Sequence, residues 1–124
     1  MKKVILLLTI IIIAYGCQSN DPVELSKYIG TKWTANDDIS KLVYGGVCTT
    51  TIEFLTESTC QEINVRSGSA SFPGTYLVNG TCKINGDSVS WTTKTGTIKG
   101  KITGSVLKTT MGTLAGGFRV YTKQ

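Results

Sequence analysis

The sequence contains no histidine, and this absence narrows the chemistry that the chain can perform. Histidine is the usual general base near neutral pH and the commonest metal ligand, so a histidine-based hydrolase or zinc site is excluded. No carboxylate pair stands out as a glycosidase dyad, and no glycine-rich loop leads from a strand into a helix, as phosphate-binding motifs require. We therefore predict a protein that is not an enzyme and that holds no cofactor or metal.

Long hydrophobic runs are absent except at the N-terminus. Residues 4–13 are apolar apart from Thr9, follow a pair of lysines and lead into Gly16 and Cys17. A spanning helix needs ~20 apolar residues, so this stretch is too short and has instead the layout of a secretory signal. With a small residue directly before the cysteine, it resembles a bacterial lipoprotein signal, in which Cys17 is acylated and becomes the mature N-terminus.

Lipidation would divide the chain into a signal peptide at 1–16, a lipidated tether at 17–21 and one domain at 22–124. Two or three acyl chains on Cys17, each worth ~0.8 kcal/mol per buried CH₂, would hold the protein stably on a membrane. We then expect a monomer in the bacterial cell envelope, on the outer membrane, with no nucleic-acid partner. The alternative is an ordinary secretory signal that leaves Cys17 as an unmodified thiol.

Helix signals are confined to the start of this domain. Asp21 can cap a helix, Pro22 suits its first position, and Gly30 is placed to end it in a left-handed conformation. Beyond Gly30, abundant threonine and regularly spaced glycine predict strands. We expect Asn79-Gly80 to form a bulge inside one long strand. The predicted strands cover 31–35, 41–45, 47–55, 60–66, 74–84, 88–94, 97–103, 106–111 and 117–122, of which 41–45 is the weakest.

Alternation assigns one face of each strand to the interior. Short antiparallel strands with one apolar face must close on themselves or pair with a second sheet. We predict an all-β fold, an antiparallel meander of about eight strands closed into a barrel, with a two-sheet β-sandwich as the alternative. The predicted interior residues are Ile52, Phe54, Ile63, Val65, Tyr76, Val78, Cys82, Ile84, Val89, Trp91, Ile98, Gly100, Ile102, Phe118 and Val120.

Several short phrases carry a family resemblance. The helix signals before Gly30-Thr31-Lys32-Trp33, together with Thr51-Ile52-Glu53-Phe54, the segment 74–80 and the C-terminal segment 118–124, resemble the small lipocalin-like lipoproteins of Bacteroidetes-type bacteria. The resemblance implies a barrel with a short N-terminal helix and a cup for a small apolar ligand. It also implies that Arg119 packs over Trp33, although Arg119 pointing to solvent is an equal alternative. The large residues predicted to point inward are Tyr76, Trp91 and Phe118. They either line the ligand cup or form part of the core.

Two further sites follow from short patterns. Asp87-Ser88-Val89 resembles an O-glycosylation signal of exported Bacteroidetes proteins, which marks Ser88. The adjacent Asp37 and Asp38 are predicted to lie in a solvated turn, with a calcium site as the less favoured alternative because calcium needs about six oxygens.

Three cysteines remain once Cys17 is assigned to lipid. Antiparallel pairing of 60–66 with 74–84 places residue 60 near residue 82, and an exported chain meets oxidising conditions, so we predict a Cys60–Cys82 disulfide. A bridge from Cys48 to Cys60 is the alternative, and otherwise Cys48 is a buried thiol. The spacing does not match a zinc motif.

Negative charge is scarce in the second half, where Asp87 is the single acid after residue 66. The predicted strands place Lys94, Lys99 and Lys101 on the outer face, as a partner surface or simply as a solvated wall. We predict a lipid-anchored protein that binds a small apolar ligand or a partner. The alternative is an envelope inhibitor or interaction module acting through its loops and this basic face, and a filled barrel would favour it.

Overall fold

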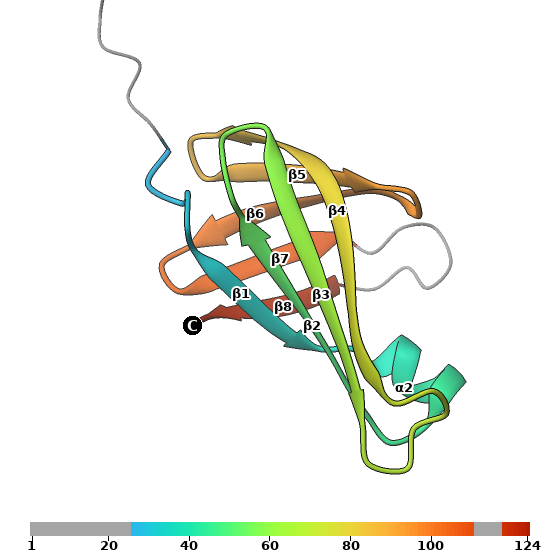
Figure 1. Ribbon diagram of the computed structural model, residues 1–124. Helices are drawn as coiled ribbons and strands as arrows, with labels where there is room; N and C mark the ends of the chain where they lie inside the picture. Colours follow the sequence, from blue (N-terminus) through green and yellow to red (C-terminus); the bar gives the residue numbers. More distant parts are fainter. Residues whose placement is uncertain (1–25, 111–117) are drawn as a thin grey trace, which may run out of the picture.

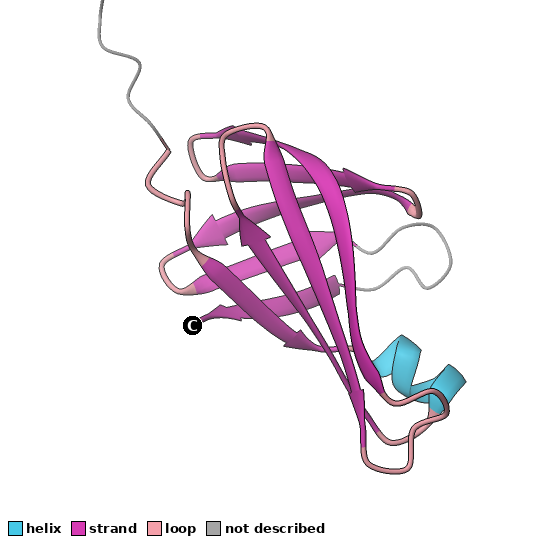
Figure 2. Cartoon of the chain, in the orientation of Figure 1, coloured by secondary structure: helices cyan, strands magenta, loops and turns pink. Residues whose placement is uncertain are grey.

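The chain forms a closed antiparallel β-barrel (Figures 1 and 2). The structure is a computed structural model that describes residues 26–110 and 118–124. Each strand pairs with the next, and the first pairs with the last to close the barrel, so the predicted all-β barrel is confirmed and the β-sandwich is excluded. The elements are β1 (Lys32–Asn36), α2 (Asp38–Tyr44), β2 (Val47–Phe54), β3 (Thr59–Ser67), β4 (Gly74–Asn85), β5 (Ser88–Thr93), β6 (Gly96–Thr103), β7 (Val106–Thr110) and β8 (Phe118–Lys123).

The helix α2 replaces the strand that the sequence predicted at 41–45, so that prediction is wrong. Asp37 caps the helix because its side chain accepts a hydrogen bond from the backbone N–H of Ser40 at 3.0 Å. Gly45, with φ of 72°, ends it by donating its N–H to the carbonyl of Lys41. The solvated turn predicted for Asp37 and Asp38 is also wrong, because Asp37 is buried and only Asp38 is exposed.

The N-terminal helix predicted to end at Gly30 is not present in its described part. Residues 27–30 form a turn, in which the N–H of Ile29 bonds to the carbonyl of Ser26 at 3.1 Å. Gly30 does adopt the expected left-handed conformation, with φ of 76°. The proposed cap at Asp21 and Cys17 both lie outside the described residues.

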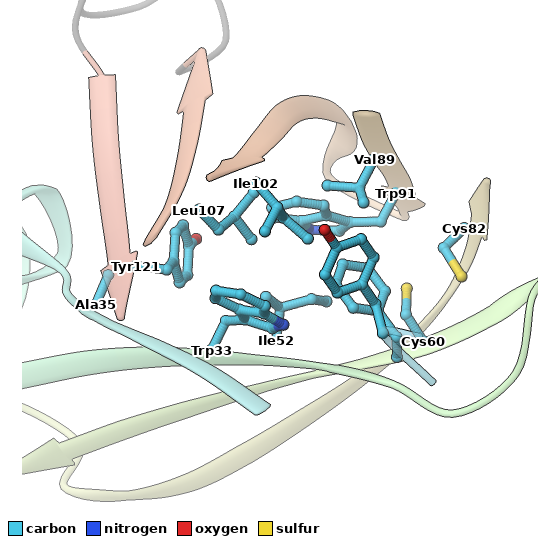
Figure 3. Close-up of a cluster of buried hydrophobic side chains, with 12 residues drawn as sticks. Trp33, Ala35, Ile52, Cys60, Cys82, Val89, Trp91, Ile102, Leu107 and Tyr121 are labelled. Carbon is cyan, nitrogen blue, oxygen red and sulfur yellow. The ribbon is translucent and has the colours of Figure 1, made fainter. Parts of the chain in front are cut away.

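Aromatic side chains fill the half of the barrel near Ser26, which we call the closed end (Figure 3). The rings of Phe54 and Tyr121 each meet Trp91 edge-on, at centroid distances of 6.3 and 6.0 Å. The Trp33 indole N–H donates to the Thr31 hydroxyl at 2.8 Å. Such edge-to-face contacts add ~0.5–1.5 kcal/mol each to the burial of the rings. This half is therefore a packed core.

The interior faces follow the predicted alternation on most strands but not on β3 and β8. On β3 the inward residues are Cys60, Glu62, Asn64 and Arg66, so Ile63 and Val65 face outward. On β8 the inward residues are Arg119 and Tyr121, and Val120 is half exposed. The side chain of Phe118 lies outside what the structure describes. The predicted interior residues that are confirmed as buried are Ile52, Phe54, Cys82, Val89, Trp91 and Ile102.

The β2–β3–β4 sheet extends past the rest of the barrel toward α2 (Figure 1). β3 pairs with β4 in one register from Arg66–Gly74 to Thr59–Thr81, so the predicted bulge at Asn79-Gly80 is wrong. Glycine is needed at position 80 for another reason: a Cβ there would lie 2.5 Å from the carbonyl oxygen of Thr92. β5 pairs only with residues 81–85 of β4, which leaves the other edge of 74–80 without a partner strand among the described residues.

Candidate functional site

Polar side chains gather inside the barrel at the end where α2 lies, which we call the α2 end. Arg119 and Asp37 form an ion pair there, with 2.7 Å between Nη2 and Oδ1, and both side chains are largely buried. The Asp37 carboxylate also accepts hydrogen bonds from Ser40 and from the Thr50 hydroxyl. Burial alone would raise the pKa of Asp37, but the Ser40 hydrogen bonds, the Arg119 charge and Thr50 together hold it below its ordinary value.

Arg119 therefore neither packs over Trp33 nor points to solvent, the two alternatives predicted from the sequence. Alternation along β8 turns its side chain into the barrel, where it meets Asp37 and donates to the Tyr121 hydroxyl at 3.4 Å. The structure records no stacking on Trp33, whose ring instead meets Tyr28 edge-on. A buried guanidinium needs a counter-ion, and the helix cap supplies one.

A chain of hydrogen bonds continues from this ion pair toward the core. The Thr50 hydroxyl lies 3.0 Å from Asp37 and 2.8 Å from the Asn64 side-chain oxygen, so its single proton serves one acceptor at a time. Asn64 donates to Glu62, whose other oxygen accepts from the indole N–H of Trp91 at 3.4 Å. Asp37 and Glu62, the acids that the described residues place inside the barrel, are thus already engaged in hydrogen bonds.

Arg66 differs from Arg119 because no acid among the described residues forms an ion pair with it. Its guanidinium carbon lies 3.5 Å from the ring centroid of Tyr44 and 4.6 Å from that of Tyr76. Within the described ranges it makes no hydrogen bond or ion pair, and its Nε is buried without a partner. A buried donor without an acceptor costs free energy, and the Nε of Arg66 is the one such side-chain atom in the part of the chain that the structure describes.

Exposed apolar side chains lie on α2 and on the loop between β3 and β4, the two segments joined to the tyrosines that contact Arg66. No residue of α2 is buried, although the helix carries three aliphatic residues at helical spacing. Phe72, in the loop between β3 and β4, is 73% exposed. We call the group of exposed side chains Ile39, Leu42, Val43 and Phe72 the apolar patch.

The loop that carries Phe72 is fastened to its surroundings. The Ser71 N–H donates to the carbonyl of Tyr44 at 2.6 Å, and the Tyr76 hydroxyl donates to the carbonyl of Phe72 at 2.7 Å. Phe72 itself has φ of 56°, a left-handed conformation that is unfavourable for a bulky residue. Such strain persists only where the surroundings impose it, and it is commonest at functional positions.

The predicted ligand residues do not come together. Trp91 belongs to the packed core and lies opposite Cys82 in the β4–β5 pairing. Tyr76 is six positions away along β4, partly exposed beside Arg66. Phe118 pairs through its backbone with Thr110, and its side chain is not described. Tyr76 and Trp91 therefore do not line one cup.

The cysteines that the structure describes are free thiols, so the predicted Cys60–Cys82 disulfide is not formed. Their sulfurs point toward each other in Figure 3, but Cys60 pairs with Gly80, which leaves Cys82 two positions out of register. The pKa of Cys60 is raised to about 12, mainly because the thiol is buried and secondly because Cys82 lies beside it. Cys48 is a buried thiol, as expected.

The remaining predicted positions lie on the outer wall. Lys99 and Lys101 are exposed there, whereas Lys94 is exposed in the turn between β5 and β6. A shallow hollow of about 340 Å³ runs across β6 and β7 beside Lys99 and Lys101. Ser88 is exposed at the start of β5, and its glycosylation stays a prediction. In the described part of the chain, no cluster of acids and cysteines is suited to a metal, and no helix is long and apolar enough to cross a membrane.

Comparison of the chain with protein-family models, with curated proteins and with solved structures found no match. Sequence reasoning missed the apolar patch and Arg66. Two signals were available for the patch: the Asp37–Ser40 cap spacing and the apolar residues at 39, 42 and 43. Nothing local in the sequence distinguishes Arg66 from an ordinary surface arginine.

Proposed function

We propose that this protein is a lipid-anchored, non-catalytic interaction module of the bacterial cell envelope, and that it binds a partner protein through the apolar patch. The observation that carries the proposal is the exposure of Leu42 and Phe72, 87% and 73%, on segments that are held in place. Exposed apolar area costs ~25 cal/mol per Å² relative to burial, so a cluster of such side chains on a small domain is typical of a binding surface.

The filled interior supports a surface partner over a small apolar ligand. Trp33, Phe54, Trp91 and Tyr121 have essentially no exposed surface, and the ring of Trp91 contacts those of Phe54 and Tyr121 directly. A ligand in that half of the barrel would have to displace packed aromatic side chains. An eight-stranded barrel is narrow enough for side chains alone to fill it.

The two ends of the barrel suggest how the molecule is oriented. Ser26, the first described residue, lies at the closed end, and α2 lies at the opposite end (Figure 1). Nine residue steps separate Cys17 from Ser26, a span of at most about 30 Å. A lipid on Cys17 would therefore keep the closed end near the membrane, and the apolar patch would face away from it. That orientation favours a protein over the lipid surface as the occupant.

Site-specific photo-crosslinking in the host tests this proposal. A photoreactive phenylalanine analogue at Leu42 and, separately, at Phe72 should each give a crosslinked protein of the same mass. The matched control is Thr97, an exposed position on β6. Ile39 is also exposed, so an Ile39→Ser substitution should reduce the crosslinked products from Leu42 and from Phe72 without unfolding the barrel. Products no stronger than at Thr97, or crosslinks to lipid alone, would rule out the proposed surface.

A further inference from the structure

We infer that the Arg66 guanidinium binds a carboxylate carried on an apolar peptide segment. The part of this inference that assigns the carboxylate to a partner protein rests on the proposed function. The site consists of Arg66, the rings of Tyr44 and Tyr76, and the neighbouring Phe72.

Arg66 makes no ion pair with either of the acids that the structure describes inside this end of the barrel. Asp37 is committed to Arg119, Ser40 and Thr50, and Glu62 accepts from Asn64 and Trp91. Two arginines thus lie inside this end of the barrel, one with a carboxylate and one without. A half-buried guanidinium that lacks a counter-ion binds an external anion more strongly than a fully solvated one, because little further desolvation is needed.

The surroundings of Arg66 also fix which atoms a ligand would meet. Ring contacts engage the flat face of a guanidinium, and its N–H donors point outward in the plane. Because Nε is buried, the donors left for a ligand are the two terminal nitrogens. These form the planar fork that binds both oxygens of a carboxylate. The Tyr76 hydroxyl does not compete, since it already donates to the carbonyl of Phe72.

The groups next to Arg66 favour a carboxylate that adjoins an apolar side chain of the same ligand. Tyr44 and Tyr76, which hold Arg66, are each hydrogen-bonded to the loop that carries Phe72. A carboxylate on Arg66 would therefore lie near the loop that carries Phe72, one of the residues of the apolar patch. A peptide in which Asp, Glu or the C-terminal carboxylate adjoins a leucine-like residue meets both features at once, whereas inorganic phosphate meets only the first.

Arginine side-chain NMR of the full chain in detergent micelles tests the inference. Arg66 and Arg119 are the arginines of the sequence, so two Nε–H signals are expected, and Arg119 serves as the internal control. Acetyl-Leu-Asp-Leu-amide should shift the Arg66 signal saturably, with a dissociation constant in the millimolar range, and leave Arg119 in place. Acetyl-Leu-Asn-Leu-amide should shift neither signal. An equal response to the Asn peptide, or a response to phosphate but not to the Asp peptide, would overturn the inference.

Substitutions then separate this inference from the proposed function. Arg66→Gln should weaken binding of the Asp peptide about tenfold or more, the loss expected for a charged hydrogen bond, while Arg66→Lys retains part of it. Unchanged affinity in a folded Arg66→Gln protein would refute the carboxylate site. If the crosslinking fails but the Asp peptide still shifts Arg66, the carboxylate site stands and only its protein source is lost. If Arg66 does not respond while the crosslinks persist, the interaction proposal stands without this site.

Discussion

Asp37 and Arg119 form an ion pair at 2.7 Å although they are 82 positions apart in the chain. Asp37 is also the cap of α2, so the same carboxylate joins the start of the helix to the last strand of the barrel. This link holds α2, and with it the apolar patch, against the barrel. The stability of the proposed binding surface therefore depends on a contact inside the protein.

We expect Arg119→Gln to destabilise the protein by about 3–5 kcal/mol, because it leaves the Asp37 carboxylate buried without its counter-ion. Urea unfolding followed by tryptophan fluorescence measures the change. The control is Lys32→Gln, which removes the more exposed Lys32–Glu53 pair and should have a much smaller effect. Equal effects of the two substitutions would contradict the role of the buried pair.

The same carboxylate should make the protein sensitive to acid. Since the folded state lowers the pKa of Asp37, its contribution is present above the ordinary value of 3.8 and is lost as pH falls through that value toward the folded pKa. Thermal unfolding between neutral and acidic pH measures this loss. In Asp37→Asn the decline below about pH 4 should be shallower than in the parent. A parallel decline in both proteins would assign the sensitivity to other carboxyl groups.

Removing Trp91 should test whether the closed end is a packed core. We expect Trp91→Ala to lower the free energy of unfolding by about 3–5 kcal/mol, since the ring is buried against Phe54 and Tyr121. Leu77→Ala, at a position that is 61% exposed, is the control and should change little. A Trp91→Ala protein as stable as the parent would mean that this interior is not tightly packed.

Two glycines offer a matched test of how the Phe72 loop is seated. A Cβ on Gly46 would lie 2.4 Å from backbone atoms of Ser67 and Ala70, whereas one on Gly68 would meet nothing within 4 Å. Both have positive φ, so alanine carries a similar backbone strain at each. Gly46→Ala should therefore reduce crosslinking from Phe72 far more than Gly68→Ala does. Similar losses would show that backbone strain, and not contact with the loop, is responsible.

Membrane attachment is tested at Cys17. If this cysteine is acylated, Cys17→Ser should abolish labelling with radioactive palmitate and move the protein out of the membrane fraction. The control is Cys48→Ser, a buried thiol inside the barrel, which should stay labelled. Continued labelling of Cys17→Ser would refute the anchor and leave an ordinary secretory signal.

The barrel itself was predictable because alternation is a local property. On β2, β5 and β6 the alternation predicted from the sequence places Ile52, Trp91 and Ile102 inward, and the structure buries all three. On β3 the alternation is reversed: apolar Ile63 and Val65 face outward, and polar Glu62 and Asn64 face inward. That reversal follows from the polar network, whose members come from distant strands, and no short window of sequence reveals it.

The candidate site was less predictable for a related reason. α2 is short, and its residues also suit a strand, so the capping interaction of Asp37 decided between the two structures. Arg66 stands out because it has no hydrogen-bond or ion-pair partner among the described residues. This could not be predicted from the sequence, because it depends on Asp37 and Glu62 being engaged elsewhere in the fold.

Hydrogen–deuterium exchange of the full chain, free and bound to the crosslinking partner, is the most direct test of the account. Binding at the α2 end predicts slower exchange at residues 38–44 and 68–76, with the closed end unchanged. Protection of the β6–β7 wall around Lys99 and Lys101, or of the core strands around Trp91, would contradict it.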